Sequence, residues 1–240
     1  MNVRASACAV LLALATATPL RAELLPHVLA EHNPVEARTW FAQHNALVNR
    51  ARLGHIALLF IGDSLTYAWR LDGSETWDAR FAPLGAEDFG IGGDRTEDVR
   101  WRANNGELDG IAPRAVVLEI GTNDLAVGRS VGATVEGIRA CVHAIRSKLP
   151  GAIIIVVAIL PRGGGPQMPE RRDIAAVNAR IAKLDDGRMI RYIDTGGAFL
   201  KPTGELREEL YRFDFIHLSS RGYLAWADAL NPALARLRLR

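Results

Sequence analysis

The sequence contains little cysteine, no long hydrophobic run and almost no excess of charge of one sign. Two cysteines among 240 residues cannot form the disulfide framework that stabilises small secreted domains. No unbroken apolar run exceeds nine residues, which is too short for a helix that spans a membrane. Lys and Arg total 29 against 27 Asp and Glu, so the charge gives no argument for binding to nucleic acid. What remains is the composition of an ordinary folded domain, which excludes a disordered, collagenous or multi-span membrane protein.

The first 22 residues have the pattern of a secretory signal peptide. Arg4 supplies the positive charge, residues 7–15 form the apolar segment, and small residues follow it. We predict cleavage after Ala17 or after Ala22, and hence a protein that is secreted or located in the periplasm. A short N-terminal helix that packs into the core is the alternative interpretation. Cleavage after Ala22 would leave residues 23–240 with equal numbers of basic and acidic side chains.

Short apolar runs alternate with helical patterns along the rest of the chain. The runs cover residues 55–61, 86–90, 116–120, 153–160 and 189–193. The third and fourth are apolar throughout, which is typical of parallel strands that are covered on both faces. Between these two, apolar positions recur at helical spacing until Pro150 and Gly151. The sequence therefore predicts one domain over residues 23–240, a three-layer α/β/α fold with about five parallel strands.

In such a fold ligands bind beyond the carboxyl ends of the strands, and polar motifs follow the first three runs. Ser64 lies in a tight turn after the first run, where it presents a hydroxyl to a ligand or caps a helix. A glycine-rich turn over residues 90–94 either offers backbone N–H groups to an anion or serves as a plain turn. Asn123 is either a neutral amide donor or the start of an Asx-turn. Nucleotide binding is disfavoured, because Arg95 stands where a dinucleotide fingerprint has glycine or alanine.

A fourth motif, near the C-terminus, joins a carboxylate to an imidazole. Asp214 precedes His217 by three positions, a spacing that lets the carboxylate orient one ring nitrogen while the other faces a nucleophile. No second histidine or cysteine is close enough in sequence to suggest zinc, so we expect no metal and no other cofactor. Hydroxyl, imidazole, carboxylate and three anion donors together form a complete set for acyl transfer.

These motifs occur in an order that resembles the GDSL/SGNH hydrolases. They are Gly-Asp-Ser-Leu at residues 62–65, the glycine-rich turn, Gly-Thr-Asn-Asp at 121–124 and Asp-Phe-Ile-His at 214–217. Trp101-Arg102 and the segment at 105–108 resemble, within this family, the catalytic alpha subunits of platelet-activating-factor acetylhydrolase. The likeness extends over nearly the whole chain that would remain after signal cleavage.

The resemblance implies a flavodoxin-like fold and a serine esterase that needs no metal. By the family pattern Ser64 is the nucleophile, His217 is the base, and Asp214 orients the base. The N–H groups of Ser64 and Gly93 and the amide of Asn123 would form the oxyanion hole. The apparent signal peptide departs from those acetylhydrolase subunits, which are intracellular, so their natural substrate is not carried over.

A second serine motif, Gly-Arg-Ser-Val-Gly at residues 128–132, matches the nucleophile elbow of α/β-hydrolases. That elbow directly follows a strand, whereas here several residues separate the motif from the end of the third apolar run. We therefore predict that Ser130 caps a helix instead of acting as a nucleophile.

The function that we expect is hydrolysis of short-chain, acetyl-type carboxylic esters by a secreted or periplasmic serine esterase. The substrate would be a small ester, such as an acetylated carbohydrate or lipid. Two alternatives stay open: a lysophospholipase or thioesterase of the same fold, and a non-catalytic domain that binds carbohydrate or lipid. We expect neither a nucleic-acid partner nor a stable membrane span, and a homodimer is compatible with the sequence.

Overall fold

A five-stranded parallel sheet forms the centre of the protein. The computed structural model describes residues 26–27 and 34–236, so the predicted signal peptide lies outside the described residues. The strands are β1 (Leu58–Gly62), β2 (Ala86–Gly90), β3 (Ala115–Glu119), β4 (Ile153–Val157) and β5 (Ile190–Ile193). Their order is β2-β1-β3-β4-β5, and every neighbouring pair is parallel. This is the strand order of the flavodoxin-like doubly wound fold, and the predicted fold class is confirmed.

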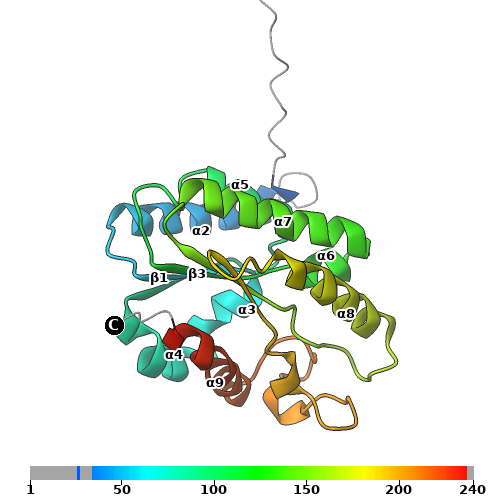
Figure 1. Ribbon diagram of the computed structural model, residues 1–240. Helices are drawn as coiled ribbons and strands as arrows, with labels where there is room; N and C mark the ends of the chain where they lie inside the picture. The colour runs from blue at the N-terminus through cyan, green and yellow to red at the C-terminus, as the bar shows by residue number, and fades with distance from the viewer. Residues whose placement is uncertain (1–25, 28–33, 237–240) are drawn as a thin grey trace, which may run out of the picture.

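Helices cover both faces of the sheet and complete three layers (Figure 1). The first layer consists of α2 (Pro34–Arg52), α5 (Thr96–Asn104), α7 (Val131–Lys148) and α8 (Pro169–Ile181). The second consists of α3 (Ser64–Tyr67), α4 (Ser74–Arg80) and α9 (Ser220–Arg236). The short α6 (Thr122–Ala126) follows β3, and 3₁₀ turns lie at Ala68–Arg70, Ala82–Leu84, Ala182–Leu184, Gly196–Phe199 and Glu208–Leu210.

β1 and β4 carry no polar side chain, because successive residues of these strands enter two different cores. Leu59 and Ile61 of β1 pack under the first helical layer, whereas Leu58 and Phe60 pack under the second. Every residue of β1 and of β3 is buried. Full burial of one such side chain stabilises the fold by about 1.5–3 kcal/mol, so the two cores fix the sheet firmly.

The helix expected between the third and fourth strands is α7. Its buried face contains the four predicted residues, Val135, Ile138, Val142 and Ile145. Ser130 is its N-cap, since the hydroxyl accepts a hydrogen bond of 3.2 Å from the N–H of Ala133. The prediction that Ser130 caps a helix is confirmed.

Cys141 lies on the same helix and is completely buried. Its Sγ is 3.0 Å from the backbone carbonyl oxygen of Thr96, to which the thiol donates. Burial raises the pKa of the thiol, because the apolar surroundings disfavour the thiolate. The side chain therefore packs as a small apolar group in the first core.

One strand is shorter than predicted. We expected it to extend to Leu160, but β4 ends at Val157, and the residues that follow remain buried without strand structure. The side-chain amide of Asn178 on α8 explains this end. Its oxygen accepts from the N–H of Ile159 and its nitrogen donates to the same residue's carbonyl, both at 2.9 Å. These two bonds satisfy the backbone where a neighbouring strand would otherwise do so.

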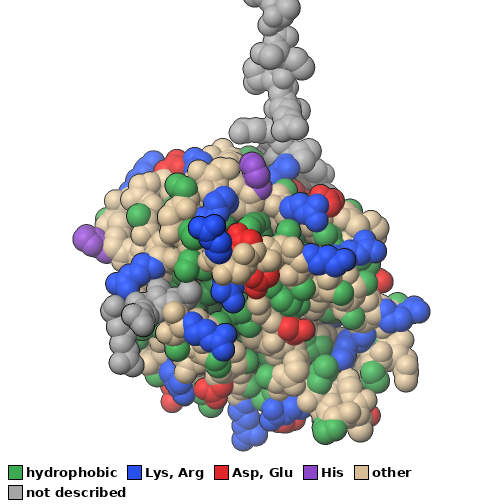
Figure 2. Space-filling model, in the orientation of Figure 1, with side chains coloured by type: hydrophobic (Ala, Val, Ile, Leu, Met, Phe, Trp, Pro, Cys, Tyr) green, Lys and Arg blue, Asp and Glu red, His purple; other side chains and the backbone are tan. Residues whose placement is uncertain are grey.

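The described surface shows no large excess of one charge on the side seen in Figure 2, where acidic side chains lie among the basic ones. This mixture agrees with the nearly balanced composition. Among the helices at residues 34–236, none is both long enough and apolar enough to cross a membrane.

Candidate active site

Ser64 is placed at the carboxyl edge of the sheet by the tight turn between β1 and α3. A Cβ atom on Gly62 would lie 2.2 Å from the carbonyl oxygen of Glu119, so the strand can end in this way only with glycine. Asp63 then caps α3, because its Oδ1 accepts a hydrogen bond of 2.9 Å from the N–H of Leu65. The turn leaves Ser64 partly exposed as the first residue of the helix.

The imidazole of His217 reaches Ser64 from the segment that precedes α9. Its Nε2 lies 3.0 Å from Ser64 Oγ, and its Nδ1 lies 2.7 Å from Asp214 Oδ2. Because a carboxylate can only accept, Nδ1 carries the proton, which leaves Nε2 free to accept from the serine hydroxyl. The structure therefore brings together the three residues that the sequence singled out for nucleophilic chemistry.

The carboxylate of Asp214 is held in place by its own turn. Its Oδ1 accepts hydrogen bonds of 2.9 Å from the N–H groups of Ile216 and His217. Burial raises the pKa of Asp214, but the hydrogen bonds from the His217 side chain and from these two backbone groups outweigh burial and lower it below its ordinary value. Asp214 is therefore a stable anion beside the imidazole.

The three predicted oxyanion donors come from Ser64 itself, from the glycine-rich turn after β2 and from Asn123 after β3. A Cβ on Gly92 would be 3.9 Å from Ser64 Cβ, so the glycine-rich turn passes close to the serine. The backbone of Gly93 has φ +83°, a conformation that favours glycine. Asn123 Nδ2 donates one hydrogen bond of 2.9 Å to the carbonyl of Asp94, which leaves its second N–H available. Within the described part of the chain, the backbone N–H groups of Ser64 and Gly93 donate no hydrogen bond.

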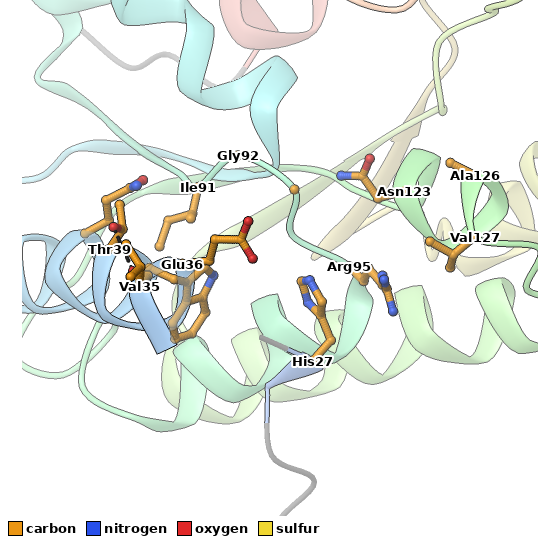
Figure 3. A pocket seen from close by; sticks show the side chains of 13 residues that line it. His27, Val35, Glu36, Thr39, Ile91, Gly92, Arg95, Asn123, Ala126 and Val127 are labelled. Carbon is orange, nitrogen blue, oxygen red and sulfur yellow. Dashed lines mark hydrogen bonds between the residues drawn. The ribbon is translucent and has the colours of Figure 1, made fainter. Parts of the chain in front are cut away.

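A pocket of about 470 Å³ adjoins these donors (Figure 3). Gly92, Gly93 and Asn123 form one of its walls. The rest is lined by apolar Val35, Trp40, Ile91, Ala126 and Val127 and by polar His27, Glu36, Thr39, Gln43 and Arg95. Figure 3 shows the side chains of Glu36 and His27 directed into the space beside Gly92. A mainly apolar cavity with a few polar groups is the usual form of a small-molecule site.

Two carboxyl groups are buried beneath the serine. Burial raises the pKa of Asp63 to about 7, against lowering by the hydrogen bond from Leu65. Burial, and then the charge of Asp63, raise the pKa of Glu119 well above its ordinary value. Neither oxygen of Glu119 has a hydrogen-bond partner among the described residues. Both groups therefore favour the neutral form more strongly than a solvent-exposed carboxyl group does.

One group of side chains, to which the pocket-lining His27 belongs, has the donor types of a metal site. His27, Glu97 and Asp98 present ligand atoms within 4.8 Å of one another. However, Asp98 accepts from both the N–H and the Nδ1 of His27, and Glu97 accepts two hydrogen bonds from the guanidinium of Arg129. These partners already compensate both carboxylates, so the donor set does not call for a cation.

Comparison with known proteins agrees with this geometry. The family model described as "GDSL-like Lipase/Acylhydrolase family" matches residues 60–225. The chain belongs to this family. It is 36% identical over 199 residues to the human protein "Platelet-activating factor acetylhydrolase IB subunit alpha2", an alignment that covers 82% of this chain and 84% of the relative. Both findings make the chain an ester hydrolase.

Solved structures share the fold at lower identity. A protein described as a putative platelet activating factor from Streptococcus pneumonia aligns with a TM-score of 0.65 and 20% identity, over 83% of this chain and 96% of that one. A catalytic mutant of an acetylxylan esterase from Geobacillus stearothermophilus aligns with a TM-score of 0.59 and 20% identity, over 72% and 92%. At these identities the comparison supports the three-layer fold.

The residues around the site include several that sequence reasoning missed. Asp124 accepts from the N–H and the hydroxyl of Thr96, at 3.0 and 2.7 Å, and so ties α6 to α5. The indole Nε1 of Trp40 donates to Asp94 Oδ1 at 2.7 Å. In the sequence, Asp94 and Asp124 could be noticed only as charged residues in segments that the fold must bury. No spacing in the sequence indicates which residue each of them contacts.

Proposed function

We propose that the protein is a serine esterase that hydrolyses short-chain, acetyl-type esters. The observation that carries the proposal is the continuous hydrogen-bonded series from Asp214 through His217 to Ser64, with distances of 2.7 and 3.0 Å. A nucleophile within reach of a base, which a third group orients, is the arrangement that activates a hydroxyl.

In the first half of the reaction, Ser64 Oγ attacks the ester carbonyl carbon while His217 Nε2 takes the hydroxyl proton. The carbonyl oxygen becomes an anion, and Asp214 stabilises the imidazolium. When the bond between carbon and the alcohol oxygen breaks, Nε2 returns the proton to the leaving alcohol. In the second half, water attacks the acyl-serine with the same base, and the carboxylic acid leaves as Ser64 is restored.

The anionic oxygen would be held by the N–H groups of Ser64 and Gly93 and by the second N–H of Asn123. These donors come from three different strand ends, which rigid secondary structure fixes before substrate binds. Donors that are already aimed at the developing charge need no reorganisation during the reaction, and each contributes about 10²–10³ to kcat.

The pocket beside the donors would take the alcohol part of the ester. An acetyl group fills only a small fraction of about 470 Å³, so the cavity has room for a much larger group. Its polar side chains Glu36, Thr39 and Gln43 suit an alcohol with further hydroxyl groups, as in an acetylated carbohydrate. A relative with acetylhydrolase in its name and a structural neighbour named acetylxylan esterase support the acetyl group.

The protein would act after export, as a single domain over residues 23–240. The pattern of the first 22 residues supports export, and the completely buried thiol of Cys141 suits an oxidising compartment. N-terminal sequencing of the protein recovered from the periplasm or medium tests this, and an unprocessed N-terminus in the cytoplasm would contradict it.

The decisive experiment measures kcat/KM for p-nitrophenyl esters from acetyl to palmitoyl, below micelle formation, followed by acetylated sugars. We expect a maximum at the shortest chains, no effect of EDTA, and stoichiometric labelling of Ser64 by a fluorophosphonate. A maximum at eight or more acyl carbons would point to a lysophospholipase or thioesterase. If the protein is neither labelled nor turns over any ester, the alternative of a non-catalytic binding domain would remain.

A further inference from the structure

Asp94 connects the two oxyanion donors that do not belong to Ser64. It directly follows Gly93, and its backbone carbonyl accepts the 2.9 Å hydrogen bond from Asn123 Nδ2. Its side chain is completely buried, so its position is set entirely by what it contacts inside the protein. Any movement of Asp94 therefore moves the Gly93 N–H and the Asn123 amide together.

Two buried donors fix this side chain. Arg102 Nε donates to Asp94 Oδ2 at 2.7 Å, and Trp40 Nε1 donates to Asp94 Oδ1 at 2.7 Å. Arg102 also donates to the carbonyls of Gly62 and Phe89, each at 3.0 Å, and so joins the ends of β1 and β2 to the turn. These contacts hold the strand ends in one rigid unit.

Trp40 differs from the other partners because it comes from α2. This helix lies outside residues 60–225, the segment that the family model matches. The indole is 5% exposed and packs against the rings of Phe41, His44 and Trp101, with centroids 5.0–5.8 Å apart. The packing of α2 therefore orients the indole N–H toward Asp94.

We propose that Trp40 is a positioning residue of the oxyanion hole, acting through Asp94. The inference rests on the proposed function and adds that a helix outside the family segment sets the geometry of the hole. If the indole N–H is removed, Asp94 Oδ1 loses its donor at a completely buried position, and the turn must shift to compensate. A displacement of about 1 Å at catalytic groups costs on the order of 10² in rate.

The test compares Trp40→Phe with Trp101→Phe, using p-nitrophenyl acetate. Both changes remove an indole from the same aromatic cluster, but Trp101 makes no hydrogen bond to Asp94. Trp40 also lines the pocket, so its replacement can change KM as well. Coupling to the oxyanion hole predicts in addition that Trp40→Phe lowers kcat by about tenfold or more, whereas Trp101→Phe leaves kcat within about threefold. Equal losses of kcat in the two variants, or a loss that lies in KM alone, would overturn the proposal.

A double variant separates a positioning role from general destabilisation. The fold losses in kcat caused by two independent substitutions multiply, whereas the losses caused by two substitutions in one structural unit do not. We expect Trp40→Phe with Asn123→Ala to lose clearly less than the product of the two single losses. A loss equal to the full product would show that Trp40 acts elsewhere.

A measurement on the unaltered chain covers the case in which Trp40→Phe fails to fold. Phosphonylation of Ser64 by a fluorophosphonate places an oxygen in the proposed hole, and the indole N–H resonance of Trp40 should then shift. That of Trp77, on the other face of the sheet, should not. An unmoved Trp40 signal would refute the coupling. If the wild-type protein neither labels nor turns over, the proposed function has failed instead.

Discussion

His217 Nε2 lies 3.0 Å from Ser64 Oγ, although 153 positions separate the two residues in the chain. Ser64 is fixed by the end of β1, while His217 is fixed by the turn before α9. The hydroxyl of Tyr223 on α9 donates to the carbonyl of Leu65 at 2.8 Å and holds the two segments together. The reactive pair thus exists only when the C-terminal helix is docked on the sheet.

The first prediction concerns the two serines that lie in motifs. Ser64→Ala should lower the rate of hydrolysis by several orders of magnitude, because the remaining hydrogen-bond donors cannot provide a covalent step. Ser130→Ala should keep its activity and lose about 0.5–2 kcal/mol of stability, since it removes an N-cap. Steady-state kinetics and thermal unfolding of both variants check this, and an inactive Ser130→Ala variant would refute our assignment.

Asn123→Ala should fold normally and lose about 10²–10³ in kcat, the usual effect of one missing oxyanion donor. Asn104→Ala is the matched control, because this exposed amide only donates to the carbonyl of Arg100. A near-normal kcat of the Asn123 variant, measured with p-nitrophenyl acetate, would show that the amide only shapes the turn through Asp94.

The pH dependence follows from the proton that His217 must accept. A protonated imidazole cannot act as a base, so kcat/KM should fall as the pH is lowered. Asp214 should not limit the rate there, because the hydrogen bonds from His217 and the backbone keep its pKa below the ordinary value in spite of burial. His217→Ala should be inactive, and a kcat/KM that does not fall on acidification would exclude the imidazole as the base.

Asp63 should make the stability depend on pH in a defined direction. Burial raises its pKa from 3.8 to about 7, so between these values the folded state binds more protons than the unfolded state. Stability therefore falls as the pH rises through this window. Asp63→Asn should remove this decrease, so its melting temperature relative to wild type should rise from pH 4 to pH 8. Asp173→Asn, at an exposed position, should show no such trend. If melting temperature plotted against pH gave parallel curves for Asp63→Asn and wild type, the prediction would be refuted.

The pocket beside the hole should determine selectivity for the alcohol part. Val127 is 51% exposed at its edge, so Val127→Trp would fill space without disturbing the core. We expect a higher KM for an acetylated xylo-oligosaccharide and little change for p-nitrophenyl acetate. Leu53→Trp, at an exposed position outside the pocket lining, is the control. An effect that instead grows with acyl length would assign the pocket to the acyl chain.

The sequence predicted the sheet and the grouping of the candidate side chains at its edge because both follow local rules. Continuous apolar runs indicate buried strands, and Ser64 and Asn123 could be placed at strand ends from those runs alone. His217 was distinguishable from the other histidines since Asp214 lies three residues before it.

The contacts that support the site could not be predicted in this way. Trp40 meets Asp94 across 54 positions, and His27, which has no partner motif in sequence, binds Asp98 across 71. Each pair depends on where a helix docks on the sheet, a result of packing that no periodicity encodes. The end of β4 was misplaced for the same reason, because the side chain that replaces its partner strand comes from α8.

The burial of Cys141 would have a consequence for an exported chain. A thiol reacts as an accessible thiolate, so the folded protein should be inert to thiol reagents and to disulfide exchange. In a chain that starts at residue 23, unfolding would expose one reactive sulfur, and two unfolded molecules could become covalently joined. Under oxidising conditions, the native packing around Cys141 would thus prevent disulfide bonds between molecules. The rate at which a thiol reagent modifies Cys141 would then measure the rate of unfolding.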